Sequence, residues 1–243
     1  MPLVWITGAS QGLGRAAALD HAGAGWTVAA SARSVDVLTS IGGGTKPYPL
    51  DVTDRAATAT TVAVIEAVEG PIDRAILNAG THIPFDAATF DPTVFDRLFA
   101  LNVGGVVNCL AALVPRMVAR GTGEIAIVAS VAGYRGLPTA AAYGASKAAL
   151  INMAEALQMD LAPKGVRVRL VNPGFVRTPL TDKNDFAMPA LMEPDVAARR
   201  LRQGLDRGGF EVTFPRRFTY VLKLLGLLPN ALYLPLVARA TKR

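Results

Sequence analysis

The sequence predicts an α/β fold, a single doubly wound domain built on a seven-stranded, mainly parallel sheet. Short apolar runs of strand length alternate with longer segments of helical periodicity along most of the 243 residues. The first two strands, at residues 3–7 and 26–32, are separated by a glycine-rich turn and a helix. A 51% hydrophobic composition is sufficient for one large core. Ligands of such sheets bind beyond the carboxyl ends of the strands, so candidate site residues should lie there.

The remaining elements continue this alternation. Five further strands are expected at residues 48–50, 73–77, 124–129, 166–171 and 211–214. Thr53 is expected to cap a helix that runs to about Glu69. Asp91-Pro92 starts another helix, because proline is favoured at the first helical position. A third long helix is expected from about Ala141 to Leu161.

Two segments near the carboxyl end of the chain differ from this body. The sequence from Thr178 to about Glu193 is irregular and interrupted by prolines, so we expect a lid within a ligand-binding domain of residues 1–214. Residues 215–243 form a basic, leucine-rich extension of the same domain, in which Pro229 and Pro235 are expected to break two short helical stretches.

The net charge of +6 is concentrated in this extension. It holds six of the 25 basic residues and none of the 19 acidic ones, so the rest of the chain is neutral. A neutral body argues against nucleic acid as a partner, and a basic, leucine-rich segment is typical of contact with a membrane surface or a protein. Pro229 ends the apolar run that starts at Phe218, which is too short to cross a bilayer.

Cysteine and histidine are scarce. A single cysteine, Cys109, excludes an intrachain disulfide, and with only His21 and His82 no metal site is expected. The segment Met1 to Ile6 has neither the basic region nor the cleavage site of a secretory signal. We therefore expect a cytoplasmic protein, with peripheral contact to a membrane left open by the extension.

A glycine-rich loop, Thr-Gly-Ala-Ser-Gln-Gly-Leu-Gly at residues 7–14, joins the first strand to the first helix. Glycine permits a tight turn and a close approach, and the N–H groups at the start of a helix attract a pyrophosphate. In a strand–loop–helix–strand unit this loop predicts dinucleotide binding rather than an ordinary turn.

Tyr143 and Lys147 are four residues apart on a predicted helix, so they share one face. An ammonium group near a phenol lowers the phenol pKa from about 10 towards neutrality, which lets the phenol act as a general acid or base. The spacing alone is weak evidence. Its weight comes from Ser130, at the carboxyl end of a strand, and from Asn102, the polar member of an apolar helical stripe.

Together these motifs resemble the short-chain dehydrogenase/reductase family in its single-domain, Rossmann-type form. Thr-Gly-x-x-x-Gly-x-Gly is that family's glycine loop, and further matches follow in family order over residues 3–214. Leu77 departs from the family pattern, which often has a second asparagine there. The resemblance implies that the cofactor is bound by Gly8, Ser10, Gln11, Gly12, Leu13, Gly14, Arg33, Asp51, Val52, Asn78, Ala79, Gly80, Tyr143, Lys147, Pro173, Gly174, Val176 and Thr178.

The resemblance also implies catalytic roles, which make residues 1–214 a dinucleotide-binding catalytic domain. Tyr143 would donate a proton to a carbonyl oxygen as the nicotinamide hydride attacks carbon, and Ser130 would hydrogen-bond the same oxygen. Lys147 would bind the nicotinamide ribose and lower the tyrosine pKa. Asn102 would hold a water that links Lys147 to solvent.

The cofactor is expected to be NADP(H) rather than NAD. An NAD enzyme usually has an acidic residue at the end of the second strand, which binds the 2′-hydroxyl of the adenine ribose. This chain has Ser31-Ala32-Arg33 there, and a guanidinium favours a 2′-phosphate. The alternative is that Arg33 is only a solvated loop cation.

The residues expected to line the substrate pocket are mostly apolar, which favours an apolar ketone, aldehyde or secondary alcohol. The resemblance implies, by position in the family, that they are Ile83, Phe85, Val131, Tyr134, Phe175, Phe186, Met188 and Met192. Arg135 is the one candidate for contact with an acidic group. Two other functions stay open: reduction of C=N or C=C bonds, and a non-catalytic dinucleotide-binding module whose tail binds a membrane or a partner.

Three roles stay open for residues 215–243: a helix packed on its own domain, a subunit interface, or a surface that rests on a membrane. The family commonly assembles through the two long helices that here contain Phe95 to Leu113 and Ala145 to Leu157. The resemblance therefore implies a homodimer or homotetramer.

Overall fold

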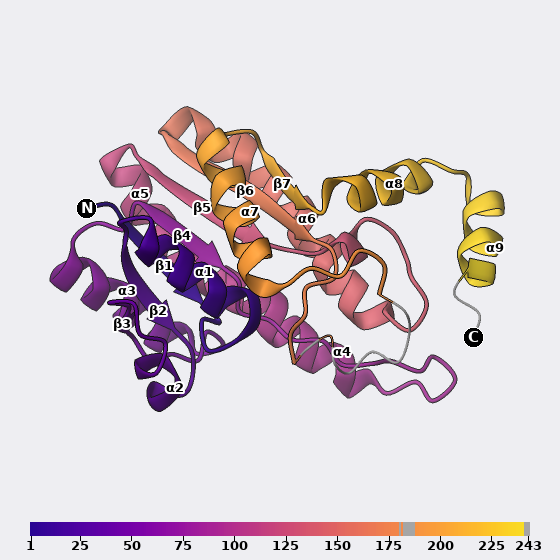
Figure 1. Cartoon of the computed structure of the whole chain (residues 1–243), viewed down its shortest axis with the longest axis horizontal. Helices are drawn as coiled ribbons and strands as arrows, with labels where there is room; N and C mark the ends of the chain where they lie inside the picture. The colour runs from indigo at the N-terminus through magenta and orange to yellow at the C-terminus, as the bar shows by residue number, and fades with distance from the viewer. Residues whose placement is uncertain (180, 182–187, 241–243) are drawn as a thin grey trace.

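The computed structural model describes residues 1–179, 181 and 188–240, which form one α/β domain around a seven-stranded sheet (Figure 1). All strands are parallel and are arranged in the order β3-β2-β1-β4-β5-β6-β7. Their bounds are β1 Leu3–Thr7, β2 Thr27–Ser31, β3 Lys46–Pro47, β4 Arg74–Leu77, β5 Gly123–Val128, β6 Val166–Pro173 and β7 Glu211–Phe214. The predicted fold class is confirmed, with a sheet that is wholly rather than mainly parallel.

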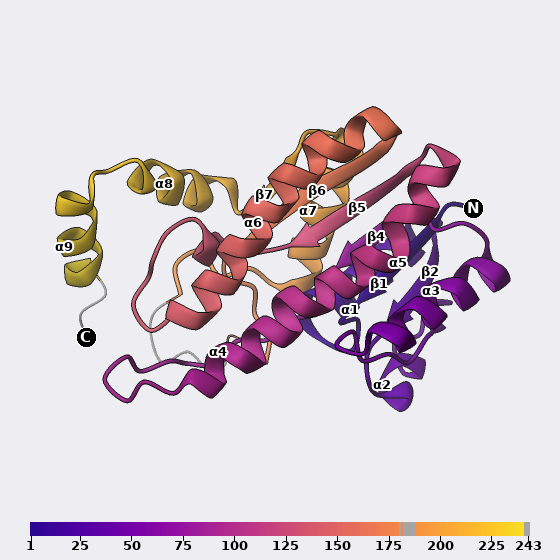
Figure 2. The ribbon, with the colours of Figure 1, turned by 180° about the vertical axis from the view of Figure 1, so that it is seen from behind.

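Helices cover both faces of the sheet (Figures 1 and 2). The face with α1 and α7 is seen in Figure 1, and the face with α3, α5 and α6 in Figure 2. The helix bounds are α1 Gly12–Gly23, α2 Val35–Thr39, α3 Arg55–Glu69, α4 Pro92–Phe99, α5 Gly105–Arg120, α6 Ala141–Leu161, α7 Pro194–Arg207, α8 Arg216–Gly226 and α9 Asn230–Ala240. Successive strand residues point to opposite faces, so Leu3 and Trp5 enter one core cluster and Val4 and Ile6 the other.

The direction in which strands are added reverses at β1. The chain proceeds from β1 to β2 and β3 on one side and then to β4 on the other, so β1 and β4 are neighbours. The crevice beyond the carboxyl ends of such a pair is where doubly wound sheets bind ligands. The glycine-rich loop leaves β1 at this crevice.

α4 and α5 are joined by a π turn at Ala100–Gly104, so the helix runs without a break from Pro92 to Arg120. Asp91 caps it as expected, and its carboxylate accepts a hydrogen bond of 2.9 Å from the Thr93 N–H. This helix is long and apolar enough, by length and composition alone, to cross a membrane. Leu98, Leu113 and Met117 are each 0% exposed within the fold, which is the behaviour of a core helix.

The edge strand β3 and the start of α3 differ from the expectation. The strand pairs with β2 at Lys46–Pro47 rather than at 48–50, although the N–H groups of Tyr48 and Leu50 still donate to the Ala30 and Ala32 carbonyls, each at 2.9 Å. Thr53 is not the cap of α3. Asp54 accepts the capping bond from the Ala57 N–H at 2.9 Å, while Thr53 donates to Asp51.

Two helices were not expected, and one predicted break is wrong. α2 begins after Ser34, which accepts from the Val37 N–H, and α7 begins at Pro194 after the irregular segment. Pro235 lies inside α9 instead of breaking it. The carbonyl that Pro235 leaves without an intrahelical donor belongs to exposed Ala231, so water can satisfy it.

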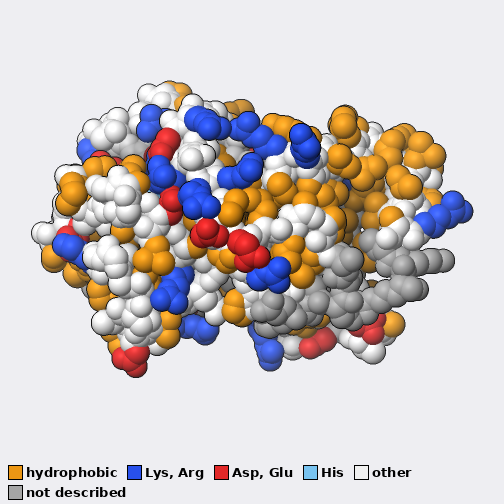
Figure 3. Space-filling view, viewed as in Figure 1, with side chains coloured by type: hydrophobic (Ala, Val, Ile, Leu, Met, Phe, Trp, Pro, Cys, Tyr) orange, Lys and Arg blue, Asp and Glu red, His pale blue; other side chains and the backbone are white. Residues whose placement is uncertain are grey.

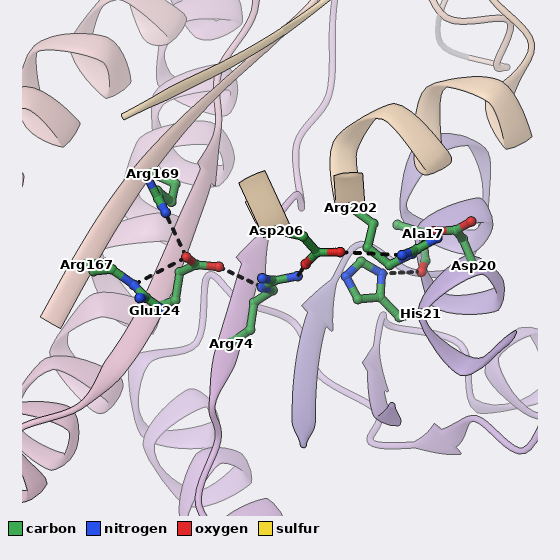
Figure 4. A network of polar contacts seen from close by, with 9 residues as sticks. All are labelled: Ala17, Asp20, His21, Arg74, Glu124, Arg167, Arg169, Arg202 and Asp206. Atoms are coloured by element: carbon green, nitrogen blue, oxygen red, sulfur yellow. Dashed lines mark hydrogen bonds and ion pairs between the residues drawn. The ribbon is translucent and has the colours of Figure 1, made fainter. Parts of the chain in front are cut away.

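A buried carboxylate joins the amino-terminal ends of β4, β5 and β6 (Figure 4). Glu124 is 2% exposed and accepts from Arg74 at 2.6 Å and from Arg169 at 3.1 Å, with Arg167 3.5 Å away. The Arg74 guanidinium also lies 4.6 Å from the centre of the Trp26 ring. One negative charge therefore balances two buried guanidinium groups, those of Arg74 and Arg169, while the Arg167 side chain is 65% exposed.

The same network continues onto α7 and α1. Asp206 accepts from Arg74 at 3.0 Å, and Arg202 donates to Asp20 at 2.6 Å. Next to Asp20, His21 donates from Nδ1 to the Ala17 carbonyl at 2.8 Å, and burial lowers its pKa to about 4, so the ring is neutral. These contacts lie at the opposite end of the sheet from the glycine loop and hold the two layers together.

Glu124→Gln should lower the free energy of unfolding by about 3 kcal/mol, because it leaves buried guanidinium groups without their counter-charge. Urea denaturation measures the change. Glu155→Gln, an exposed glutamate on α6, is the matched control and should stay within about 0.5 kcal/mol of wild type. Equal losses in the two variants would contradict a stabilising role for the network.

Candidate active site

The glycine loop has the shape of a cradle that side chains cannot enter. Gly8 and Gly12 have φ of 67° and 55°, and a Cβ on Gly14 would overlap the carbonyl oxygen of Gly8. The residue before α1, Gln11, makes no capping hydrogen bond through its side chain, so the first N–H groups of the helix stay available to an anion. Ser10 and Leu13 complete the loop, with Leu13 buried below it.

The end of β4 holds this loop in place. The Asn78 amide donates to the carbonyls of Thr7 and Gly8, each at 3.2 Å. The Thr7 hydroxyl in turn accepts from the backbone N–H groups of Asn78 at 3.0 Å and Ala79 at 3.1 Å. A Cβ on Gly8 would lie 2.8 Å from the Ala79 Cα. Three of the predicted cofactor residues thus form the contact between β1 and β4.

Ser130 and Tyr143 meet above the carboxyl end of β5. Ser130 follows the strand, and its hydroxyl accepts from the Ala132 N–H at 3.1 Å and hydrogen-bonds Tyr143, which extends from the first turn of α6. Lys147, one turn further on, is 5% exposed, and its Nζ lies 5.7 Å from the centre of the Tyr143 ring. The predicted Ser–Tyr–Lys set is brought together as its spacing requires.

The predicted effect of Lys147 on the tyrosine is absent from this arrangement. Burial raises the pKa of Tyr143 above its usual 10, and the hydrogen bond from Ser130 opposes that rise only in part. Lys147 donates from Nζ to the Val128 carbonyl at 2.9 Å, and its own pKa is lowered to about 8 by burial. In this arrangement the ammonium charge is directed at a strand-end carbonyl, and the effect of Lys147 on the tyrosine stays a prediction.

Asn102, in the π turn, ties the loop after β4 to the catalytic helix. Its Oδ1 accepts from the Thr81 N–H at 2.8 Å, and its Nδ2 donates to the Thr81 carbonyl at 3.0 Å and to the Ser146 hydroxyl at 3.1 Å. A Cβ on Gly80 would lie 3.1 Å from Asn102 Oδ1 and 3.6 Å from Lys147 Nζ. The π turn, a deviation that is frequent at functional sites, therefore lies beside the lysine.

Arg33 and Asp51 lie together on the exposed side of β2. Arg33 is exposed, and its charge helps to lower the pKa of Asp51, which is lowered mainly by hydrogen bonds from Thr53. Ser31 is turned inward, where its hydroxyl accepts from the Trp5 indole N–H at 2.9 Å. Val52 is buried against Gly105 in α5, so its backbone, rather than its side chain, is available to a ligand.

The segment after β6 reaches back to the glycine loop. Pro173 ends β6, and the Gly174 N–H donates to the Phe214 carbonyl at 2.8 Å. Val176 pairs with Met192 in an isolated bridge, which closes the base of the predicted lid. Thr178 packs on Gly12, where a Cβ would lie 2.7 Å from its methyl group. Phe186 and the rest of residues 182–187, together with residue 180, lie outside the described residues.

Several residues expected in the substrate pocket serve other purposes. Met192 is 8% exposed and belongs to the core below α7. Phe85 packs edge-on against Phe90 and Phe95, at ring distances of 5.1 and 5.3 Å. The Tyr134 hydroxyl donates to Glu211 at 2.6 Å. These contacts fix the three side chains in the fold. The pocket roles of Ile83, Val131, Phe175 and Met188 stay predictions.

Arg135 binds the carboxyl-terminal helices. Its guanidinium donates to the carbonyls of Gly226 at 2.8 Å and Leu228 at 2.6 Å, and lies 4.0 Å from the centre of the Tyr233 ring. The Tyr233 hydroxyl donates to the Gly136 carbonyl at 3.0 Å. Arg135 is thus neither solvated nor available to a substrate.

Two residues near the site escaped the sequence reasoning. The His82 ring packs edge-on against Tyr143, with ring centres 4.9 Å apart. Glu211, on β7, accepts from Tyr134, Asn172 and Lys223, and so connects the ends of β6 and β7 to α8. His82 lies two residues after Gly80 of the Asn-Ala-Gly turn, and this closeness is the sequence feature that could have identified it. No sequence feature marks Glu211.

The site fits a nicotinamide dinucleotide. The glycine cradle and the open start of α1 suit a pyrophosphate, and the end of β2 suits the adenine ribose. Tyr143, Ser130 and Lys147 then lie at the other side of the crevice, where the reacting end of the cofactor belongs. Such a set, with a phenol as proton donor, defines an oxidoreductase of the Rossmann class.

Comparison with known proteins identifies the family. A model of the short chain dehydrogenases matches residues 2–188. An uncharacterized oxidoreductase of Myxococcus xanthus is 38% identical over 94% of this chain and 93% of its own length. The 3-oxoacyl-[acyl-carrier-protein] reductase of Thermotoga maritima is 36% identical over 73% of this chain and 75% of its own length. The structure of a short chain dehydrogenase from Burkholderia cenocepacia in complex with NADP matches with a TM-score of 0.85 and 27% identity. The match covers 100% of this chain and 98% of that protein.

The chain therefore belongs to the short-chain dehydrogenase/reductase family, and is an oxidoreductase that uses a nicotinamide cofactor. The resemblance read from the glycine loop and the Tyr143/Lys147 pair is confirmed at the level of family and fold. The roles of individual residues stay predictions.

Two glycines of the same helix should respond in opposite ways to alanine. Gly14→Ala should lower the free energy of unfolding by about 3 kcal/mol and weaken dinucleotide binding, because its Cβ meets backbone. Gly23→Ala has open space around its Cβ and should stabilise the fold by about 0.5 kcal/mol. Urea denaturation and cofactor titration measure both. A Gly14→Ala protein that binds cofactor like wild type would refute the cradle.

Proposed function

We propose that the protein is an NADP(H)-dependent oxidoreductase that interconverts the carbonyl and secondary alcohol of an apolar small molecule. The observation that carries this proposal is the contact between Ser130 and Tyr143, next to buried Lys147 and opposite the glycine cradle. A non-catalytic binding module has no need of this intact set.

The bound nicotinamide would supply the hydride or accept it. The chain's own residues would handle the proton. Tyr143 would hold it at Oη and transfer it to the substrate oxygen, and the high pKa of this tyrosine keeps the phenol protonated until that moment. Ser130 would orient the same oxygen by its hydroxyl. Lys147 would leave the Val128 carbonyl for a ribose, which would bring its charge to bear on the phenol.

Tyr143→Phe should reduce kcat by about a thousandfold, since the proton donor is lost while the ring remains. Oxidation of NADPH in the presence of a panel of ketones and aldehydes measures the rate. Cofactor affinity, titrated separately, should be unchanged. Tyr48→Phe, which removes a hydroxyl bonded to Glu69 far from the site, is the matched control and should keep the wild-type rate. Turnover by Tyr143→Phe close to wild type would sink the mechanism.

The preference for NADP(H) rests on the end of β2. Ser31 is engaged by Trp5 and Ala32 is 9% exposed, so Arg33 is the exposed side chain at the place where an NAD enzyme usually has a carboxylate. A guanidinium there would pair with the 2′-phosphate. The Burkholderia cenocepacia relative, which binds NADP, supports the same choice.

Arg33→Glu should weaken NADPH binding at least about tenfold, because a charge-assisted hydrogen bond is replaced by repulsion. NADH, which has no 2′-phosphate, is the internal control and should bind to the variant as it does to wild type. Fluorescence titration of both cofactors measures the four dissociation constants. Tighter binding of NADH than NADPH by the wild-type protein would overturn the assignment.

The substrate proposal rests on the apolar character of the surroundings. Val131 is buried directly after Ser130, and Phe175 contacts Phe218 of α8 with ring centres 5.9 Å apart. The only basic side chain proposed for an acidic substrate, Arg135, is engaged by the tail. The Thermotoga maritima relative, a 3-oxoacyl reductase by name, supports reduction of a ketone.

Assembly and compartment are proposals of the same kind. We propose that the protein works in the cytoplasm as a homodimer or homotetramer formed through α4–α5 and α6. Exposed Phe99 and Val107 on the first helix and Met159 on the second give these surfaces apolar contacts to bury.

A further inference from the structure

The tail formed by α8 and α9 is held in a defined place. Arg135 binds the carbonyls that end α8, and Tyr233 of α9 is 4% exposed. At its start, α8 packs on the loop that follows β6, where a Cβ on Gly174 would lie 3.2 Å from Phe218. The outward side chains of α8 and α9 therefore have defined positions relative to the rest of the domain.

The exposure pattern of α8 is the reverse of that of an ordinary surface helix. Thr219 is 0% exposed, and the Lys223 ammonium turns inward to Glu211. The opposite stripe, with helical spacing, is apolar and open to solvent: Tyr220, Val221, Leu224 and Leu227 are 51%, 54%, 66% and 80% exposed. α9 adds Leu232, Leu234 and Leu236, at 59%, 59% and 46%. A contiguous apolar patch of this kind marks an interaction surface.

A basic groove lies beside this patch. The groove, about 450 Å³ in volume, runs between α7, β7 and the start of α8, and its basic lining residues are Arg199, Arg200, Arg207 and Arg216. Its acid, Glu211, is neutralised by Lys223. Arg200, Arg207 and Arg216 form no ion pair with any residue that the structure describes. Figure 3 shows the basic side chains over α7 and the apolar ones over α8 and α9 on one face.

We propose that this face, the outward side of α8 and α9 with the arginine groove, docks on the surface of an anionic phospholipid membrane. Phosphate headgroups would pair with the arginines, and the leucines would enter the acyl boundary. A second copy of the chain fits less well, because a two-fold contact would bring the same basic face of both protomers, each with arginines that lack an ion pair among the described residues, into one interface. Neither helix can span the bilayer, since each has 11 residues.

Co-sedimentation of the full chain with vesicles tests the proposal. The protein should bind vesicles of phosphatidylcholine that contain phosphatidylserine, and should not bind phosphatidylcholine alone. Added salt should weaken the binding, because screening acts on exposed charges. Absence of binding to either kind of vesicle would overturn the proposal.

Two pairs of substitutions localise the surface. Leu224→Gln with Leu227→Gln, and separately Arg200→Gln with Arg216→Gln, should each weaken vesicle binding about thirtyfold. The control for the leucine pair is Val68→Gln, at a 67% exposed apolar residue on α3. The control for the arginine pair is Arg97→Gln with Lys164→Gln, and both controls should bind vesicles like wild type. An unchanged urea midpoint verifies that each variant folds.

The variants also separate a membrane from a second copy as the occupant. Tail variants that bind vesicles as tightly as wild type would overturn the proposal. A second result would also overturn it: the wild-type protein does not bind vesicles, and the variant Leu224→Gln with Leu227→Gln changes its oligomeric state, measured by sedimentation velocity. Turnover of a water-soluble carbonyl substrate is expected to be the same in all of them.

Discussion

The close contact between the glycine loop and the end of β4 is the constraint on which the site depends. Gly14 approaches Gly8 so tightly that no side chain fits, and Asn78 fastens the start of that turn by hydrogen bonds to Thr7 and Gly8. This contact lies where strand order reverses, so it sets the distance between the start of α1 and the Ser130, Tyr143 and Lys147 side chains beyond β5 and on α6. A change of geometry there would displace both halves of the crevice at once.

The two ends of the sheet use polar residues for different purposes. At the amino-terminal end, Glu124 and its arginines are satisfied by one another and stabilise the packing of layers. At the carboxyl end, Lys147 donates to the Val128 carbonyl and has a pKa lowered to about 8 by burial, and Tyr143 has a raised pKa. Groups whose pKa values are shifted by burial in this way are typical of functional sites.

Features encoded by local spacing were predicted well. The helix bounds at Asp91 and Leu161 follow from a capping residue and from helical periodicity, whereas the association of Ser130 with Tyr143 was implied by the family resemblance. The contacts that were not predicted have physical causes that distance along the chain conceals. Arg135 acquires its role from carbonyls 91 and 93 positions away, and Lys147 turns to a strand-end carbonyl that no motif reports. Pro235 is tolerated because its neighbours are exposed, which depends on tertiary placement.

The anchoring of the tail at Arg135 has a consequence for the order in which the molecule matures. α8 and α9 follow all seven strands, so the ribosome makes them after the sheet and the residues of the catalytic set. Until they emerge, Arg135 lacks the carbonyls of Gly226 and Leu228, and Gly136 lacks the hydroxyl of Tyr233. Chains fold from the amino terminus as they are synthesised. The segment after Ser130 therefore acquires its final support last, and a nascent chain carries Ser130, Tyr143 and Lys147 before it has the scaffold that positions their neighbours.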